Sequence, residues 1–339
     1  MLMEHRRLGE SGLRVSALAL GTMVFGEDGP RGTSPDVAKD MIEQFLDAGG
    51  THFDTANVYA GGRSEAILGD ALKGRRDDVT IATKVRFRTG EGPNDEGLSR
   101  RHVIASLDAS LARLRTDYVD LLYVHCWDPW TPLGETLAVL DDLVREGKVR
   151  YVGVSNYRAW QVAKARTLQS ERGWAPFVAA QYQWSLVERN LEAEFDTLCW
   201  DEGIGMMPWG PLGGGFLSGK YVRGDRPSVD TGRIGGTPDR AEESWAHRDL
   251  ERNWEVMECV HAIAAVRGAT MSQVALAWLL SRPTVSSVLL GARTPSQLAD
   301  NFGAMQVSLS DGEVATLDAV SAPDRLYPYR MIDTYGART

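Results

Sequence analysis

The sequence predicts an α/β protein in which eight parallel strands close into a (β/α)8 barrel, also called a TIM barrel. Eight short apolar runs alternate with helical patterns along the 339 residues. The runs are almost continuously apolar, as expected for parallel strands that are buried on both faces. An open dinucleotide-binding sheet would carry G-x-G-x-x-G after its first strand. Residues 21–26 read GTMVFG instead, which favours the barrel.

The first segment predicts a small β-hairpin ahead of the barrel. Residues 5–8 and 13–16 flank the turn sequence GESG, and a hairpin there would close one end of the barrel. The eight barrel strands are then expected at residues 18–21, 51–55, 80–84, 119–125, 151–155, 178–181, 204–208 and 287–290.

Helical patterns fill the gaps between these strands. In the first, Ser34 can cap the helix, Pro35 suits its first turn, and the glycine pair 49–50 ends it. Further helices are expected over residues 64–74, 101–114, 136–144, 160–168, 191–200, 256–266, 272–280 and 296–305. This alternation implies repeated βαβ units and therefore a parallel sheet.

Two stretches exceed a minimal barrel. Residues 211–250 are rich in glycine, proline and charge, so a long loop is expected after the seventh strand, over the active face. Residues 322–339 contain three tyrosines and are expected to form a C-terminal tail over the same face. We expect residues 1–339 to form a single domain: a hairpin at about 5–16, a barrel at about 18–305, and a helix and tail at 306–339.

Composition excludes several classes of protein. Lysine plus arginine total 37 against 46 acidic residues, a net charge of −9 without a basic run, which argues against nucleic-acid binding. The three cysteines form no CxxC pair, so neither a metal site nor a disulfide framework is expected. The start lacks an apolar signal core and no apolar run is long enough for a membrane helix. A cytoplasmic protein is expected; the oligomeric state is not readable.

Polar side chains end three successive strands. Chemistry in a β/α barrel takes place at the C-terminal ends of its strands. Asp54 ends the second strand and Tyr59 follows it, Lys84 ends the third, and His125 ends the fourth. Each residue alone would more often be structural, but four together at adjacent strand ends indicate a catalytic site.

These four groups suit an acid catalyst. A phenol has a pKa near ~10 and is a poor acid at neutral pH, but a nearby lysine is expected to lower that pKa. Asp54 would pair with Lys84 and compensate its buried charge. His125 would orient a substrate oxygen or take part in proton transfer. The result would be a proton donor aimed at a carbonyl oxygen.

Several longer blocks resemble the aldo-keto reductase family. They are THFDTA at residues 51–56 with Tyr59, Ser64-Glu65 and Leu68-Gly69, then DYVDLLYVH at 117–125 and GKVRYVGVSN at 147–156. The resemblance runs from about residue 5 to about residue 305. It implies a catalytic tetrad of Asp54, Tyr59, Lys84 and His125, with Tyr59 as the acid. Relatives that reduce steroid double bonds carry Glu in place of His125, and channel-associated β subunits carry Asn. Histidine therefore implies ordinary carbonyl reduction.

The resemblance also implies NADPH/NADP+ as the cofactor, extended across the barrel mouth. Ser155, Asn156 and Gln181 would bind the nicotinamide carboxamide, and Trp209 would stack on the ring. The glycine-rich residues 210–214 and Lys220 would hold the diphosphate. Arg293, at a helix start, suits a 2′-phosphate and favours NADPH over NADH. The full cofactor set is Gly21, Thr22, Met23, Asp54, Ser155, Asn156, Gln181, Trp209, Gly210, Pro211, Leu212, Gly213, Gly214, Lys220, Gly291, Arg293, Gln297, Asp300 and Asn301.

The expected function is reversible NADPH-dependent reduction of an aldehyde or ketone. The residues expected to line the substrate site are Met23, Phe25, Arg86, Phe87, Trp127, Trp130, Tyr327 and Tyr329. Their aromatic content indicates a large, flat or apolar small molecule. Two alternatives stay open. One is an NADPH-binding, redox-sensing partner protein with little turnover. The other is a barrel isomerase or aldolase that uses Lys84 as a Schiff base, which the neighbouring Asp54 disfavours.

Overall fold

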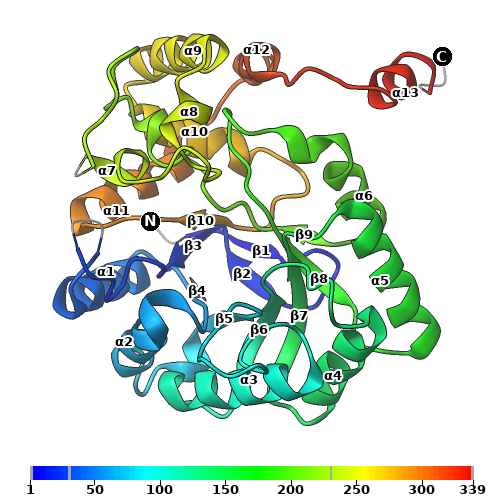
Figure 1. Cartoon of the computed structure of the whole chain (residues 1–339). Helices are drawn as coiled ribbons and strands as arrows, with labels where there is room; N and C mark the ends of the chain where they lie inside the picture. The colour runs from blue at the N-terminus through cyan, green and yellow to red at the C-terminus, as the bar shows by residue number, and fades with distance from the viewer. Residues whose placement is uncertain (1–2, 30–31, 230, 337–339) are drawn as a thin grey trace.

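Eight parallel strands form the centre of the molecule. The computed structural model describes residues 3–29, 32–229 and 231–336. The sheet has the order β10-β3-β4-β5-β6-β7-β8-β9 (Figure 1). Its strands are β3 (Leu18–Gly21), β4 (His52–Asp54), β5 (Thr80–Val85), β6 (Val119–Val124), β7 (Val149–Ser155), β8 (Phe177–Gln181), β9 (Gly205–Met206) and β10 (Val288–Leu290). All eight predicted strands are confirmed.

Backbone hydrogen bonds close this sheet into a barrel. Met206 in β9 donates its N–H to the carbonyl of Thr284 (2.8 Å), and Ser286 donates to the carbonyl of Met206 (2.9 Å). Leu289 in β10 donates to the carbonyl of Pro208 (3.0 Å). The last strand therefore pairs with β9 on one side and with β3 on the other, and the predicted (β/α)8 barrel is confirmed.

The N-terminal hairpin closes the end of the barrel where the strands begin. Strands β1 (His5–Arg7) and β2 (Arg14–Ser16) pair antiparallel. Leu8 and Val15 are fully buried. They belong to a cluster of inward-facing strand residues: Ala19, Ala82, Leu121, Tyr123, Ala179, Met207 and Leu289. The predicted hairpin is confirmed, and its apolar side chains cap the barrel interior.

Helices surround the barrel on its outer side (Figure 1). The helices between the strands are α1 (Pro35–Asp47), α2 (Arg63–Ala71), α3 (Arg100–Leu114), α4 (Leu133–Arg145), α5 (Ala159–Arg172), α6 (Phe195–Asp201), α9 (Glu251–Arg267), α10 (Met271–Leu280) and, after β10, α11 (Pro295–Phe302) and α12 (Asp311–Ser321). Ser34 caps α1 as predicted, because its side chain accepts a hydrogen bond from Val37 N–H. The apolar faces of these helices and the outer faces of the strands form the larger hydrophobic core.

The long loop after β9 is present and has short helices of its own. It contains a 3₁₀ turn, η4 (Phe216–Ser218), and the short helices α7 (Gly232–Gly235) and α8 (Trp245–Arg248). An aromatic cluster anchors it to α9: the rings of Phe216 and Trp254 lie 4.8 Å apart, and Trp245 packs against Trp254. The loop is therefore packed at both ends.

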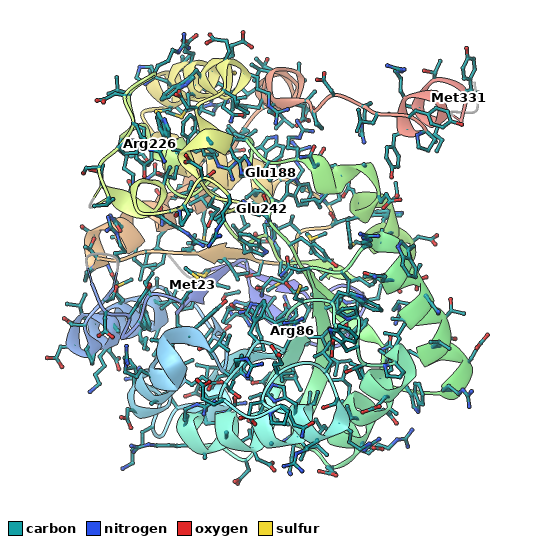
Figure 2. The ribbon with its side chains drawn as sticks, in the orientation of Figure 1. Met23, Arg86, Glu188, Arg226, Glu242 and Met331 are labelled. Carbon is teal, nitrogen blue, oxygen red and sulfur yellow. The ribbon has the colours of Figure 1, made fainter. Side chains whose placement is uncertain are left out.

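The C-terminal tail differs from the expectation that it covers the active face. Its helix α13 (Tyr329–Tyr335) stands apart from the barrel (Figure 1). Met331, labelled in Figure 2, belongs to this helix. Tyr329 is hydrogen-bonded to Glu194 beside the start of α6. The cause lies upstream, where Arg189 binds the carbonyl of Asp318 (2.9 Å) and the hydroxyl of Ser321 (2.7 Å). These bonds fix the end of α12 and direct the following chain toward α6.

Across the described ranges, no single helix is long and apolar enough to cross a membrane. Helices α9 and α10 together reach that length, but they meet at an angle of 97°.

Gly9 provides a test of the tight seal between hairpin and barrel. It has φ 54°, and a Cβ atom there would lie 2.3 Å from the carbonyl oxygen of Gly203. We expect Gly9→Ala to lower the free energy of unfolding by more than about 2 kcal/mol. Urea denaturation would measure this loss.

Gly74→Ala is the matched control. Gly74 also has a positive φ, of 81°, but no described atom lies within 4 Å of the position that a Cβ atom would take there. It should show only the backbone cost of about 1 kcal/mol. Equal losses in the two variants would contradict a close hairpin contact.

Candidate active site

A left-handed turn places Tyr59 after β4. In the 3₁₀ turn η1 (Tyr59–Gly62), Ala60 has φ 50°, Gly61 has φ 64° and Gly62 has φ 92°. The alanine carries a conformational cost of about 1 kcal/mol, because L-residues disfavour this region. The hydroxyl of Ser64 then holds the start of α2 by donating to the carbonyl of Thr22 (2.8 Å). This turn presents the Tyr59 side chain to Lys84.

Lys84 is the centre of the site. Its ammonium group is bonded to the carboxylate of Asp54, and both side chains are almost completely buried. The same nitrogen donates to the carbonyl of Thr55 (2.8 Å) and lies 3.2 Å from the hydroxyl oxygen of Tyr59. The phenol, ammonium and carboxylate that the strand ends predict to lie together are thus in direct contact.

The second oxygen of Asp54 is also engaged. Gln181, at the end of β8, donates its side-chain amide to this oxygen at 2.7 Å. Both carboxylate oxygens therefore have a partner, which a buried charge requires. The bond crosses the barrel from β8 to β4 and connects the Lys84–Asp54 pair to the opposite wall.

The environment sets the protonation of Lys84 and Tyr59. Burial alone would lower the pKa of Lys84, but Asp54 and then Tyr59 outweigh it, so that the pKa is raised and the lysine stays charged. Burial raises the pKa of Tyr59, and Lys84 offsets only part of this effect. The expectation of a net decrease in the Tyr59 pKa is therefore wrong, because desolvation of the phenolate outweighs the lysine. The hydroxyl keeps its proton at neutral pH.

His125 completes the group of four. Its ring lies edge-to-face with that of Tyr59, with centroids 5.9 Å apart, and with that of Phe87 at 4.8 Å. Burial, and then the charge of Lys84, hold the pKa of His125 well below its usual range. The imidazole is therefore neutral. Asn156 donates its side-chain amide to the backbone carbonyl of His125 (2.9 Å).

His52 lies two residues before Asp54 on the same face of β4 and is fully buried. Neither ring nitrogen has a hydrogen-bond partner among the described residues. Burial, and then the charge of Lys84, lower the pKa of His52 to about 3. A second neutral imidazole therefore lies inside the barrel below the tetrad.

The residues expected at the nicotinamide end meet at the ends of β7 and β8. Ser155 donates its hydroxyl to the carbonyl of Gln181 (2.7 Å), and Asn156 donates its amide to the Ser155 hydroxyl (2.9 Å). Trp209 follows β9, is partly buried, and packs against the inner barrel cluster. Gln181 connects these polar groups to Asp54 through its side-chain amide.

The residues expected at the phosphate end suit an anionic ligand. Gly210, Gly213 and Gly214 all have positive φ, and a Cβ atom at Gly213 would lie 2.6 Å from Val187. Pro211 is buried and Leu212 partly buried between them. Burial, and then the charge of Arg293, lower the pKa of Lys220. Two cations distant in sequence are therefore brought together near a glycine loop, as a phosphate site requires.

The remaining expected cofactor residues have mixed surroundings. Gln297 accepts from the backbone N–H of Arg293 (3.0 Å), which orders the start of α11. The Asp300 carboxylate is already bonded to Thr270 and Gln273 of the neighbouring α10 region. The Thr22 hydroxyl is held by Ser64. The others are Gly21 and Met23 at the end of β3, the exposed Gly291 and the buried Asn301.

Of the expected substrate residues, two lie beside the site. Phe87 packs on His125, and Trp127 packs on Tyr157 with ring centroids 4.9 Å apart. Met23 and Arg86, labelled in Figure 2, are partly buried and directly follow the ends of β3 and β5.

Four expected substrate residues do not lie there, one of which is Tyr329 in the distant helix α13. Phe25 is fully buried in the outer core, whereas Trp130 is 91% exposed and Tyr327 is 76% exposed. The backbone of Phe25 pairs with that of Thr33, and the ring of Phe25 lies in the core. Tyr327 leaves with the tail.

Two charged residues of the long loop could not be identified from the sequence. The charge of Arg233, on α7, reaches Tyr59 and acts to lower its pKa. Arg233 pairs with Glu243, which is only 4% exposed. No signal in the sequence points to them, because charged residues in a loop follow no periodic pattern.

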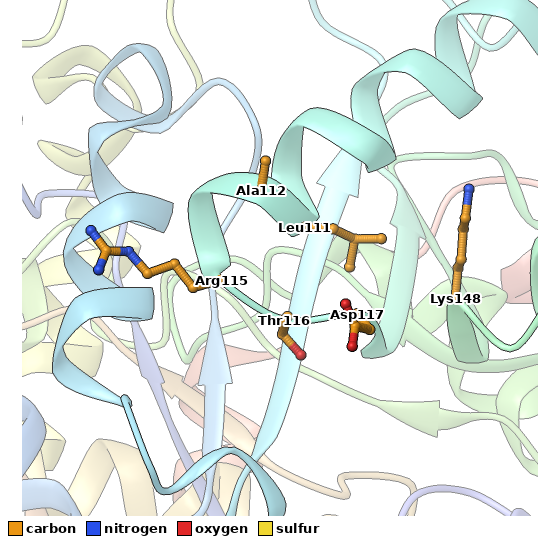
Figure 3. Close-up of a pocket in the computed structure, with 6 residues that line it drawn as sticks. All are labelled: Leu111, Ala112, Arg115, Thr116, Asp117 and Lys148. Carbon is orange, nitrogen blue, oxygen red and sulfur yellow. The ribbon is translucent and has the colours of Figure 1, made fainter.

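A hollow of about 470 Å³ lies elsewhere, at the end of α3 and the start of β6 (Figure 3). It is lined by Leu111, Ala112, Arg115, Thr116, Asp117 and Lys148. This is the end of the barrel where the strands begin, opposite Tyr59 and Lys84. Among the described residues, no group of three or more His, Cys, Asp or Glu could hold a metal ion.

Comparisons with known proteins agree with this geometry. Residues 17–322 match the sequence profile of the aldo/keto reductase family. A probable voltage-gated potassium channel subunit beta from Oryza sativa subsp. japonica is 36% identical over 337 residues, covering 97% of this chain and 100% of that protein. Versiconal hemiacetal acetate reductase from Aspergillus parasiticus is 33% identical over 348 residues, 96% of this chain and 99% of that protein. The uncharacterized oxidoreductase YrpG from Bacillus subtilis (strain 168) is 37% identical over 319 residues, 91% and 92%.

His52 predicts a specific loss of stability in acid. The folded protein keeps His52 neutral down to about pH 3, whereas the unfolded chain takes up this proton below about pH 6.5. The stability that depends on the neutral ring is therefore lost as pH falls from about 6.5 toward 3, by about 1.4 kcal/mol per pH unit.

His52→Phe removes this group while keeping a ring. Urea denaturation at pH 7 and pH 4 should show a smaller acid loss in His52→Phe than in the unchanged protein. His261→Phe, at an exposed position of α9, is the matched control. The same acid loss in all three proteins would contradict the buried neutral state.

Proposed function

This chain belongs to the aldo/keto reductase family of oxidoreductases, and on that premise we propose that it reduces an aldehyde or ketone to an alcohol with NADPH, reversibly. The observation that carries the proposal is the contact of Tyr59 with Lys84, 3.2 Å from oxygen to nitrogen, beside the carboxylate of Asp54. Carbonyl reduction requires a proton donor of this kind, and the cluster supplies one at the ends of adjacent strands.

Tyr59 would give its proton to the carbonyl oxygen as negative charge develops there. When bound, NADPH would supply the hydride that reaches the carbonyl carbon. Lys84 stabilises the phenolate that Tyr59 then becomes, because its ammonium stays charged and in hydrogen-bond contact. Asp54 holds this ammonium in place. The neutral His125 is available to donate a hydrogen bond to the same carbonyl oxygen.

Support for NADPH comes from the other end of the site. The glycine loop at residues 210–214 allows backbone N–H groups to approach a diphosphate closely. Arg293 lies close enough to Lys220 to lower the pKa of this lysine. The two positive charges would favour a phosphate group in addition to the diphosphate. The capped start of α11 adds backbone N–H groups. These features favour a cofactor with a 2′-phosphate over NADH.

The aldolase or isomerase alternative is disfavoured. A Schiff-base lysine must lose its proton, which requires a lowered pKa. Asp54 and Tyr59 raise the pKa of Lys84 instead. We therefore assign Lys84 to electrostatic support of Tyr59.

A redox-sensing partner protein stays as the second candidate. Two relatives, from rice and Arabidopsis thaliana, are named as probable potassium channel beta subunits and are 36% and 37% identical to this chain. The contact between Tyr59, Lys84 and His125 favours turnover over binding alone. NADPH binding without turnover of any carbonyl compound would favour the partner role.

We also propose that the protein is located in the cytoplasm. Its three cysteines are free thiols, which is compatible with a reducing compartment.

Tyr59→Phe tests the proton donor. With an aromatic aldehyde as probe, the NADPH absorbance decay should fall about 10²- to 10⁴-fold in kcat, since one general acid is lost. The affinity for NADPH should change little. Tyr335→Phe, in the exposed tail, should keep full activity. Unchanged turnover in Tyr59→Phe would exclude this role.

Arg293→Ala tests the choice of cofactor. The Kd for NADPH should rise about tenfold, because a charge-assisted bond to the 2′-phosphate is lost. The Kd for NADH should stay nearly the same. Arg330→Ala in α13 is the control. A matching loss for both nucleotides would show that Arg293 does not recognise the 2′-phosphate.

A further inference from the structure

Glu243 is a buried carboxylate in a position that the proposed chemistry does not use. It lies in the long loop between β9 and α9, and 4% of its surface is exposed. Its carboxylate forms an ion pair with Arg233 of α7, whose side chain is 41% exposed. Burial of a carboxylate carries a desolvation cost, and a single half-exposed partner offsets only part of it. This suggests a role for Glu243 beyond stabilising the fold.

The carboxylate lies against the glycine loop. A Cβ atom at Gly210 would be 3.1 Å from Glu243 Oε1, and one at Gly214 would be 3.6 Å from the same oxygen. These are two of the glycines that we expect to hold the cofactor diphosphate. The carboxylate therefore lies close to where phosphate oxygens would need to lie.

A second cation, this one buried, lies within electrostatic range of Glu243. Arg248 of α8 is 1% exposed and lies 3.9 Å from Glu188. Burial lowers the pKa of Arg248, while Glu188, Glu243 and Glu242 act to raise it. Figure 2 shows Glu188 and Glu242 in the same region, where the long loop covers the barrel. Glu243 thus lies within the influence of both Arg233 and Arg248.

We propose that Glu243 sets the affinity of the protein for its cofactor by competing with the diphosphate for Arg233 at the glycine loop. Before the cofactor binds, the carboxylate neutralises Arg233 and holds α7 over residues 210–214. When the diphosphate docks there, Glu243 must withdraw and Arg233 changes its anionic partner. The inference rests on the proposed function, because it takes NADPH as the ligand.

Electrostatics determines the direction of the effect. A carboxylate and a phosphate cannot share one guanidinium at close range without repulsion. Breaking the existing pair and moving the loop opposes association more than dissociation, since the competing pair exists only in the ligand-free protein. Removal of the Glu243 charge should therefore strengthen binding mainly through a faster on-rate.

The experiment compares Glu243→Gln with Glu242→Gln. Glu242 is the exposed neighbour in the same loop, so both variants lose one charge. Stopped-flow tryptophan fluorescence should show NADPH binding about three- to tenfold more tightly to Glu243→Gln than to the unchanged protein. Glu242→Gln should change the Kd less than about twofold. Adenosine 2′-monophosphate, which lacks the diphosphate, should bind equally to all three proteins.

Arg233→Gln provides the second measurement. If Arg233 passes from Glu243 to the diphosphate, Arg233→Gln should weaken NADPH binding, and adding Glu243→Gln should then give little further change. Circular dichroism confirms folding of each variant. Weaker NADPH binding by Glu243→Gln, or equal effects of Glu243→Gln and Glu242→Gln, would overturn the inference. Failure of the unchanged protein to bind NADPH would instead overturn the proposed function.

Discussion

The buried ion pair between Lys84 and Asp54 is the interaction on which the rest of the site depends. Two opposite charges almost without solvent contact are tolerated only when every remaining bonding position is filled. Thr55 and Tyr59 fill those of the lysine, and Gln181 fills the free oxygen of the aspartate. The pair therefore fixes the ends of β4, β5 and β8 relative to one another. Burial, and then the charge of Lys84, lower the pKa of both nearby imidazoles, His52 and His125.

The barrel and the positions of the four residues around Lys84 follow from patterns within the sequence. Parallel strands buried on both faces leave near-continuous apolar runs, and the residue that ends each run must lie at the mouth. That rule places Asp54, Lys84 and His125 at the mouth, and Tyr59 follows β4 by only a few residues in the sequence. The direction of the Tyr59 pKa shift could not be predicted, because it depends on how completely the folded protein excludes water from the phenol.

Features that depend on long-range contacts were not predictable in the same way. From its position after the first strand, Phe25 is expected at the mouth, but its backbone pairs with Thr33 and its ring is buried in the core. The tail reads like a cover, but Arg189 fixes its origin near α6. Arg233 and Glu243 lie in a loop without periodicity, so only the folded chain shows that they meet. In each case one tertiary contact overrides the local pattern.

The N-terminal hairpin closes the end of the barrel where the strands begin, and this affects how a proton can reach Tyr59. Leu8 and Val15 fill that end, and the strand side chains above them are packed without solvent contact. Among the described residues, this packing leaves the mouth as the route by which water reaches the phenol, and the bound substrate and nucleotide would themselves occupy that mouth. In the proposed reaction, Tyr59 would recover its proton through the same opening. Reprotonation would then be coupled to the departure of the alcohol, and the order of product release would become part of the proposed cycle.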